Sequence, residues 1–251
     1  MILCEERDRV FKISLNRPER KNALTLEMID QLQLALDRAN ASTAAVVVLG
    51  GEGSLFCSGH DFADMVERDI EQMRVLMQHC SNAMMTVRRL QQPVIAVVQG
   101  AAIGAGCQLA LSCDLVVAER SAVFRTPGAQ SGWFCSTPSV AVSRALPAKR
   151  AFEMLFCGDP VTAEQALEWG MINRVAEPGE LQRMTDDLIH ALLRGSCTAK
   201  KIGKKLFYAQ QSLDETAAYE LAQEVMASSA LLPEGQETMR AFLEKRPPKF
   251  D

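Results

Sequence analysis

Short apolar runs alternate with longer stretches of helical spacing through the first two-thirds of the chain. This alternation is typical of strand–helix units that build a largely parallel, buried sheet. The clearest predicted strands are residues 45–49, 93–98, 115–118 and 171–175. Helices are predicted after a Thr25 cap, at 62–90 and at 138–157. The chain is therefore expected to be an α/β protein.

The pattern changes near the end of the chain. From about residue 178 the strand signal stops, and helical stretches run to Arg246 before a proline-containing tail at 247–251. We expect two parts: a strand-rich core domain, residues 1–177, and a helical C-terminal subdomain, residues 178–251.

Charge and hydropathy exclude two classes of partner. The formal net charge of -4 argues against nucleic acid, whose phosphates normally require a broad basic surface. No apolar run approaches the roughly 18 residues of a membrane span, so no membrane partner is expected. The first residues lack the basic and long apolar regions of a secretory signal. A cytoplasmic protein is expected, and a processed protein of an organellar matrix is the alternative.

The 8 cysteines are scattered among small and apolar residues, in a chain too long to need disulfides for stability. We expect them to be reduced. Cys57 and His60 have the spacing of a metal-binding pair, but no second pair follows at a zinc-finger distance. No metal site is predicted.

Two glycine-rich turns follow predicted strands. Residues 50–53 lead into 56–61, and residues 100–106 open a helix. Glycine lets a ligand approach the backbone closely, and the start of a helix offers unpaired N–H groups. Tight turns without a ligand are the alternative, and the second turn lacks the third glycine of a dinucleotide fingerprint.

The order of short motifs along the chain is more specific than either turn. The motifs are Asn16-Arg17-Pro18, Asn22-Ala23-Leu24, residues 56–62, residues 100–110, Cys113-Asp114, residues 124–128, Gly132 and residues 163–170. This series resembles the enoyl-CoA hydratase/isomerase, or crotonase, superfamily over nearly the whole chain. Within it, residues 106–114 and 132–138 are most similar to the enoyl-CoA hydratase domain-containing protein 3 type. The resemblance implies a crotonase (ClpP-like) spiral of ββα units with a C-terminal trimerisation subdomain.

The resemblance also implies that two backbone N–H groups, those of His60 and Ala105, bind a thioester oxygen as it becomes an enolate. A fixed donor of this kind typically lowers a barrier by ~3 kcal/mol. Ser58, Gly59, Asp61 and Gly104 flank these donors and are expected to bind substrate. The His60 imidazole projects either toward the acyl channel or toward solvent or a subunit surface, and the sequence leaves both open.

The two catalytic glutamates of family hydratases are missing. Their positions match Gln108 and Gly128. Glutamine orients a water or carbonyl but takes no proton at neutral pH, and glycine supplies only backbone and space. In some family members that have glycine at the second position, a bicarbonate or substrate carboxylate stands in for the side chain, and Gly128 could leave such a cavity.

Other side chains near the motifs are candidates for chemistry or for binding. The candidates Cys57, Ser58, Arg125, Thr126, Cys135 and Ser136 are expected to be structural, since only His60 could serve a nucleophile as a base. Arg17 and Lys21 match family contacts to coenzyme A, and Lys245, Arg246 and Lys249 lie in a tail that can reach a neighbouring subunit's ligand. A solvated charged end is the alternative. The acyl tail is expected to contact residues 62–90 and 130–140. Trp133 and Phe134 are expected to fill the core, and lining the acyl tail is the alternative.

Two functions remain open. The first is an enzyme that acts on acyl-CoA or enoyl-CoA thioesters through an enolate, as a hydratase, isomerase or decarboxylase-like lyase. The second is a non-catalytic acyl-CoA-binding or regulatory subunit. Neither needs a cofactor, since coenzyme A is part of the substrate. The resemblance implies a homotrimer, or a hexamer built as a dimer of trimers.

Overall fold

The structure is a computed structural model and describes residues 1–250. Within them the larger sheet has the strand order β1-β2-β3-β4-β6-β9. Its strands are β1 (Ile2–Arg7), β2 (Val10–Leu15), β3 (Val46–Gly51), β4 (Val94–Val98), β6 (Leu115–Glu119) and β9 (Arg174–Ala176). Only the β1–β2 pair is antiparallel. The predicted, largely parallel sheet is therefore confirmed.

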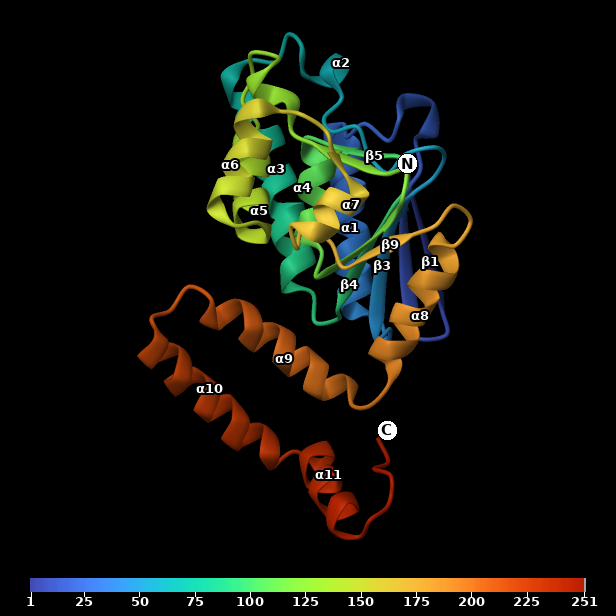
Figure 1. The fold of residues 1–251 in the computed structure, drawn as a ribbon, viewed down its shortest axis with the longest axis vertical. Coiled ribbons are helices and arrows are strands. Elements are labelled where there is room, and N and C mark those ends of the chain that lie inside the picture. Colours follow the sequence, from blue (N-terminus) through green and yellow to red (C-terminus); the bar gives the residue numbers. More distant parts are fainter. Residues whose placement is uncertain (251) are drawn as a thin grey trace.

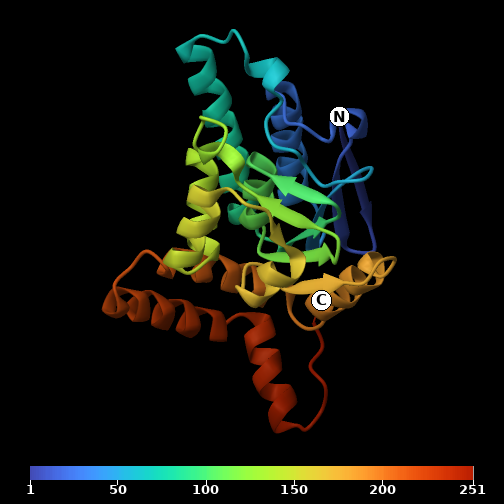
Figure 2. The ribbon, with the colours of Figure 1, turned by 45° about the horizontal axis from the view of Figure 1, so that its top comes forward.

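A smaller sheet lies beside the large one (Figure 2) and has the order β5-β7-β8. Its strands are β5 (Ala101–Ile103), β7 (Val123–Arg125) and β8 (Val161–Thr162). Cys57 forms an isolated parallel bridge with Ala102 of β5. The loop after β3 is thereby joined to the strand that leads into the next helix.

The helices of the core cover the sheet on both faces (Figure 1). They are α1 (Leu26–Ala41), α2 (Phe62–Met65), α3 (Ile70–Arg89), α4 (Ala105–Ser112), α5 (Ser136–Ala145), α6 (Ala148–Cys157), α7 (Ala163–Glu168) and α8 (Leu181–Leu193). Short 3-10 turns lie at Pro18–Arg20 and Pro127–Ala129. The predicted cap of α1 is confirmed, since the Thr25 hydroxyl accepts a hydrogen bond of 3.2 Å from the Met28 amide.

Two apolar layers hold these elements together. On one face, Leu32 and Leu36 of α1 are buried with side chains of α3, α4 and the strands. On the other face, Leu188 and Ile189 of α8 pack against the valines and isoleucine of β3, β4 and β6. Burying one such side chain stabilises the fold by roughly 1.5–3 kcal/mol.

Three predicted segments differ in their boundaries. The helical segment at 62–90 is interrupted after α2, and α3 starts at a capping box formed by Asp69 and Gln72. The segment at 138–157 is divided between α5 and α6. The strand predicted at 171–175 begins only at Arg174, because the Met171 amide instead bonds to the Ala166 carbonyl at the end of α7. The spacing of apolar residues does not reveal these local hydrogen bonds, so it did not predict these boundaries.

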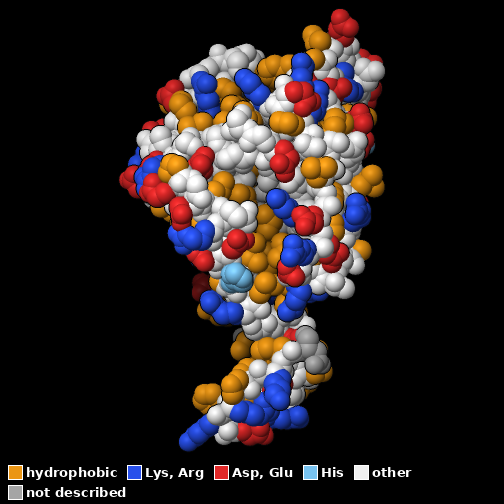
Figure 3. All heavy atoms as spheres, turned by 90° about the vertical axis from the view of Figure 1, so that its right-hand side faces the viewer, with side chains coloured by type: hydrophobic (Ala, Val, Ile, Leu, Met, Phe, Trp, Pro, Cys, Tyr) orange, Lys and Arg blue, Asp and Glu red, His pale blue; other side chains and the backbone are white. Residues whose placement is uncertain are grey.

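The C-terminal helices α9 (Cys197–Gln210), α10 (Glu215–Ala230) and α11 (Pro233–Leu243) extend away from the sheets (Figures 1 and 2). The helical end of the chain is thus confirmed. The division at residue 177 stays a prediction, since α8 packs on the sheet of the predicted core domain. Figure 3 shows this C-terminal extension as a narrow arm that carries exposed hydrophobic side chains among charged ones.

One buried ion pair joins the arm to the core. The Lys204 ammonium of α9 lies 2.7 Å from the Asp114 carboxylate and donates to the carbonyls of Val87 and Gln92. The Tyr208 hydroxyl donates to the same carboxylate over 2.6 Å. Burial lowers the pKa of Lys204 despite the attraction of Asp114. The C-terminal arm therefore depends on a charge that follows α4.

All 8 cysteines carry free thiols in the structure, and their reduced state in solution stays a prediction. Within residues 1–250, the helices fall short of the length and apolar character that crossing a bilayer requires.

Candidate functional site

A cavity of about 860 Å³ opens between the turns after β3 and β5, the N-terminal 3-10 turn and helices α2 and α3. Pockets for small ligands usually fall in the range of about 300–1,000 Å³. The predicted site residues that line it are Lys21, Ser58, Gly59, His60, Asp61, Gly104, Ala105 and Gly128. The two glycine-rich turns identified in the sequence therefore meet at one cavity.

The Asn22 side chain holds the first of the two glycine-rich turns in place by hydrogen bonds. Its buried side-chain amide donates to the carbonyls of Glu52, Leu55 and Phe56, at 2.9, 3.0 and 3.1 Å. Its side-chain oxygen accepts from the Arg17 amide at 2.8 Å. This explains why an asparagine stands in the Asn22-Ala23-Leu24 motif: its side chain supplies hydrogen bonds to carbonyls of the loop that follows β3.

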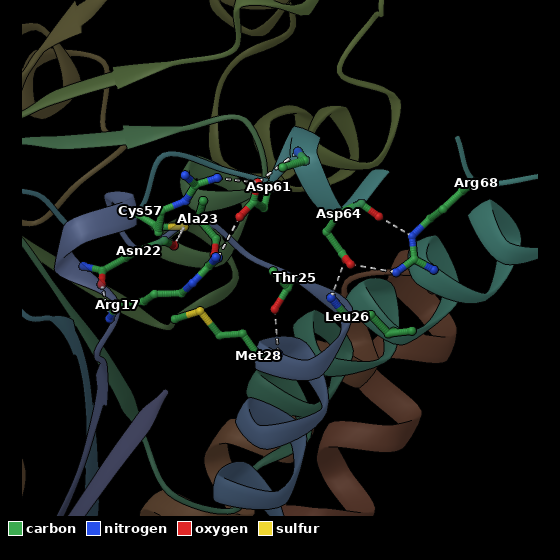
Figure 4. Close-up of polar contacts among 12 residues, drawn as sticks. Arg17, Asn22, Ala23, Thr25, Leu26, Met28, Cys57, Asp61, Asp64 and Arg68 are labelled. Carbon is green, nitrogen blue, oxygen red and sulfur yellow. Dashed lines mark hydrogen bonds and ion pairs between the residues drawn. The ribbon is translucent and has the colours of Figure 1, made fainter. Parts of the chain in front are cut away.

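Asp61 caps α2 at the edge of the cavity. Its carboxylate accepts from the Ala63 amide at 3.0 Å and from the Arg17 guanidinium at 2.8 Å (Figure 4). Burial alone would raise the pKa of Asp61, but these hydrogen bonds outweigh burial and hold it below its usual value. Arg17 is thus engaged in this pair and does not line the cavity, whereas Arg20, which the sequence did not single out, does.

Within the described part of the chain, the backbone N–H groups of His60 and Ala105 take no part in the hydrogen bonds that hold the surrounding loops. The amides of Leu24 and Asp61 bond to the carbonyls of Gly59 and Leu24, so the intervening His60 amide is directed to the other side of its chain. Ala105 is the first residue of α4, where amides have no intrahelical acceptor. Within residues 1–250 neither amide has a hydrogen-bond acceptor. Both residues line the cavity.

The chain segments that carry these two amides are in contact. A Cβ atom added to Gly59 would lie 3.4 Å from the Ala105 nitrogen and 2.8 Å from the Ile103 carbonyl oxygen. Gly59 also has a φ of 95°, a conformation that side chains disfavour. Glycine is required here because any side chain would separate the two donors.

The His60 imidazole lies inside the cavity, beside Trp133, with a distance of 6.4 Å between ring centroids. This answers the question that the sequence left open, in favour of the cavity. The Nε2 atom is buried and has no hydrogen-bond partner within residues 1–250. Burial lowers the pKa of His60 to about 4, although the charge of Asp64 opposes the change. The ring is therefore neutral near pH 7.

This lowered pKa predicts acid sensitivity. The unfolded chain binds the His60 proton near pH 6.5, while the folded protein binds it only near pH 4. Acid therefore favours the unfolded chain in this window, and the free energy of unfolding falls as the pH is lowered, by on the order of 3 kcal/mol at pH 4. His60→Gln should lose less stability between pH 6.5 and 4 in urea titrations. Parallel pH curves for the two proteins would contradict this.

The two positions at which the resemblance places the family's glutamates differ in their surroundings. Gln108 is buried on α4, does not line the cavity, and its side-chain oxygen has no partner within residues 1–250. Gly128 lines the cavity with its backbone. A Cβ atom at Gly128 would lie 2.2 Å from the Trp133 carbonyl oxygen and 2.6 Å from the Cys135 amide. The space that a side chain would occupy is thus filled by the neighbouring loop.

The expectation that Trp133 and Phe134 are core residues is wrong. Their side chains are 47% and 36% exposed and line the cavity. They lie in the loop between the turn at Gly132, whose φ is 82°, and the start of α5, and not in a helix or strand of the core. Phe62, Met73 and Met77 line the cavity from α2 and α3. A run of aromatic residues does not reveal by itself whether a loop exposes it.

The alternative nucleophiles are held in structural roles. The buried Cys57 thiol donates to the Asn22 carbonyl, and burial raises its pKa to about 12. Burial also raises the pKa of the Cys135 thiol. The Thr126 hydroxyl is buried and donates to the Met154 carbonyl. None of these side chains has the exposed, electropositive surroundings of an activated nucleophile.

The basic tail lies apart from this cavity. The Lys249 amide donates to the Glu237 carboxylate on α11, and Arg246 pairs with the same carboxylate. The cavity lining includes none of Lys245, Arg246 and Lys249. Figure 1 shows that this end of the chain is remote from α2 in the same subunit. A contact with ligand in a neighbouring subunit remains a prediction.

The comparisons with known proteins agree with the fold and the motifs. Residues 5–251 match the model of the family "Enoyl-CoA hydratase/isomerase". The chain belongs to this family. It is 40% identical to the human mitochondrial enoyl-CoA hydratase domain-containing protein 3, over 96% of this chain and 80% of that protein. It is also 30% identical to the trans-2-decenoyl-[acyl-carrier-protein] isomerase of Streptococcus mutans, over 96% of this chain and 94% of that one.

Solved structures give the same result. The crystal structure of human enoyl coenzyme A hydratase domain-containing protein 3 superposes with a TM-score of 0.95 at 38% identity, covering 99% of both chains. That of a Mycobacterium smegmatis enoyl-CoA hydratase superposes with a TM-score of 0.96 at 39% identity, covering 99% of this chain and 98% of that one. The predicted crotonase fold, its spiral core and helical C-terminal region, and the similarity to the domain-containing protein 3 type are confirmed.

Proposed function

We propose that this chain binds an acyl-CoA or enoyl-CoA thioester and stabilises its enolate between the backbone N–H groups of His60 and Ala105. The observation that carries the proposal is that both amides lack a protein acceptor within residues 1–250 and line the same cavity. Ala105 also begins α4, so the helix dipole favours negative charge at that point. Donors held in advance at a developing oxyanion are worth more than donors that must reorient.

The apolar part of the cavity suits the acyl chain. Phe62, Met73, Met77 and Trp133 line it, and methionine side chains adapt to ligands of varied shape. Arg20 and Lys21 are exposed at its rim, where they suit the phosphates of coenzyme A. No cofactor beyond the coenzyme A of the substrate enters this proposal.

Binding should depend on the thioester oxygen itself. Butyryl-CoA is expected to bind about thirtyfold more tightly than S-butyl-CoA, a thioether with the same tail and no carbonyl, because two hydrogen bonds of roughly 1 kcal/mol each are lost. Isothermal titration calorimetry measures both ligands, with free coenzyme A as a reference. Equal affinities for butyryl-CoA and S-butyl-CoA would refute the proposed role of the amides.

The second candidate function is a non-catalytic acyl-CoA-binding or regulatory subunit. It is favoured by Gln108 and Gly128, which carry no carboxylate, and by the filled space beside Gly128. Because that space is filled, a bicarbonate in place of the missing side chain would have to lie elsewhere in the cavity. A thioester preference without turnover of any enoyl-CoA or carboxyacyl-CoA ester would favour this second function.

The assembly and the compartment are part of the same proposal. Exposed apolar side chains on the C-terminal arm, including Met226, Leu231 and Phe242, support a homotrimer or a hexamer formed by two trimers. The human, mouse and rat relatives are named as mitochondrial proteins. These names support the organellar alternative over the cytoplasmic expectation.

A further inference from the structure

The cavity contains one side chain that is suited to carry a proton and is not yet used. His60 lines the cavity, and its Nε2 has no hydrogen-bond partner within residues 1–250. An unpaired polar atom in a buried position costs stability, so its presence calls for an explanation. A proton can be added to this nitrogen without breaking an existing hydrogen bond.

The other titratable side chains of the lining are engaged or lie at its rim. Asp61 is paired with Arg17 and bonded to the Ala63 amide. Glu19, Arg20 and Lys21 are exposed at the mouth. The half-buried Cys135 thiol holds its proton more firmly than usual. Among the described lining residues, His60 is therefore the side chain inside the cavity that can accept a proton and has no hydrogen-bond partner.

We infer that the His60 imidazole is the proton carrier of this site, and that the site accordingly catalyses double-bond migration in an enoyl thioester rather than hydration. The inference rests on the proposed thioester binding. Hydration needs a base for water and an acid for the α-carbon, at two positions. Migration needs one group that takes a proton from the α-carbon and returns it to the γ-carbon.

The step balances without a co-reactant. Nε2 takes the α-proton of a 3-enoyl thioester as that C–H bond breaks, and the electron pair moves toward the thioester oxygen held by the two amides. The imidazolium then returns the proton to the γ-carbon, where a C–H bond forms. The double bond moves from between the β- and γ-carbons to between the α- and β-carbons. Nothing is oxidised or reduced.

The electrostatics of the ring suit this step. With a pKa of about 4, neutral His60 is about as basic as an ordinary glutamate, whose pKa is ~4.3. The Asp64 charge favours the imidazolium that forms. Asp64 is held in turn by the Leu26 amide and by Arg68, both at 2.9 Å (Figure 4).

A ligand reaches His60 Nε2 only if the loop that carries Trp133 moves. The nitrogen is screened from water, and the Trp133 ring lies 6.4 Å from the imidazole. The Phe62 ring also packs against the Trp133 ring, and their centroids lie 6.3 Å apart. An acyl chain must shift this half-exposed ring to reach the imidazole, and the ring then excludes water that would otherwise quench the enolate.

Proton transfer can be tested without the natural substrate. In D₂O, the wild-type protein should exchange the α-protons of butyryl-CoA, followed by NMR, and should convert 3-hexenoyl-CoA to 2-hexenoyl-CoA faster than it hydrates crotonyl-CoA. His60→Ala and the larger His60→Gln should slow exchange by ~10²-fold or more. Their preference for butyryl-CoA over S-butyl-CoA should persist, because the backbone amide remains.

Two controls separate chemistry from structure. Added imidazole should restore exchange to His60→Ala, and its effect should follow the titration of free imidazole, which a merely structural role would not produce. His79→Ala, a change on the outer face of α3 where His79 pairs with Asp30, should match the wild type.

Different results would contradict the role of His60, the reaction class and the proposed thioester binding. Wild-type exchange in both His60 variants would overturn the assignment of His60, and hydration faster than migration would overturn the reaction class. A thioester preference without exchange in the wild type would overturn the inference and leave the proposed binding intact. Loss of the thioester preference itself would refute the proposed function, and the inference with it.

Discussion

Gly106→Ala is expected to destabilise the protein by at least ~3 kcal/mol and to abolish the preference for thioesters over thioethers. A Cβ atom at this position would lie 2.3 Å from the Cys57 carbonyl oxygen and 2.8 Å from the Cys57 Cβ atom. Backbone cannot rotate away from such a contact as a flexible side chain can. The clash forces apart the two segments that carry the amides of His60 and Ala105.

Urea denaturation and calorimetry with butyryl-CoA and S-butyl-CoA test both halves of this expectation. The matched control is Gly203→Ala in α9, where no atom lies within 4 Å of the added Cβ. That change should stabilise the protein by ~0.5–1 kcal/mol, as alanine does within a helix. Wild-type stability and binding in Gly106→Ala would show that the two segments are not held at this close distance.

Asp114→Ala is expected to cost ~3–5 kcal/mol of folding free energy, because it leaves the buried Lys204 charge without a counter-ion. The carboxylate also accepts hydrogen bonds from the Val94 amide at 2.7 Å and from Tyr208. Its removal leaves these donors unpaired as well. The arm of α9 should loosen first, and hydrogen exchange followed by mass spectrometry should detect faster exchange there than in β3.

Two variants control for the charge. Asp114→Asn combined with Lys204→Met removes both charges and keeps a hydrogen-bond acceptor, so it should be more stable than Asp114→Ala alone. Arg120→Ala breaks exposed ion pairs with Glu164 and Glu177 and should change stability little. A loss in Asp114→Ala no larger than that in Arg120→Ala would contradict the assigned role of the buried pair.

Local signals in the sequence predicted much of the fold. Apolar runs identified β3, β4 and β6, and the Thr25 cap followed by Met28, Leu32 and Leu36, one apolar residue every four, identified α1. The β1–β2 hairpin was not among the clearest predicted strands, because β1 is largely exposed and lacks a continuous apolar run. Breaks such as that between α2 and α3 depend on caps, which apolar periodicity does not register.

The candidate site was predictable where it depends on backbone. The resemblance placed the His60 and Ala105 amides together, and Gly59 and Gly106 stand where the two chain segments approach too closely for a side chain. Side-chain direction was not predictable in the same way. Arg17 was expected at a phosphate and instead pairs with Asp61, a residue distant in the sequence.

The sequence by itself determined the α/β class and the family, while the two amide donors and the two missing carboxylates are predictions from the family resemblance. Only the tertiary structure decided that the His60 imidazole faces the cavity and that a loop fills the space beside Gly128. The physical reason is that both facts depend on Trp133 and its neighbours, which reach the site through folding. Local patterns record backbone preferences, whereas the surroundings of a side chain are made by residues far along the chain.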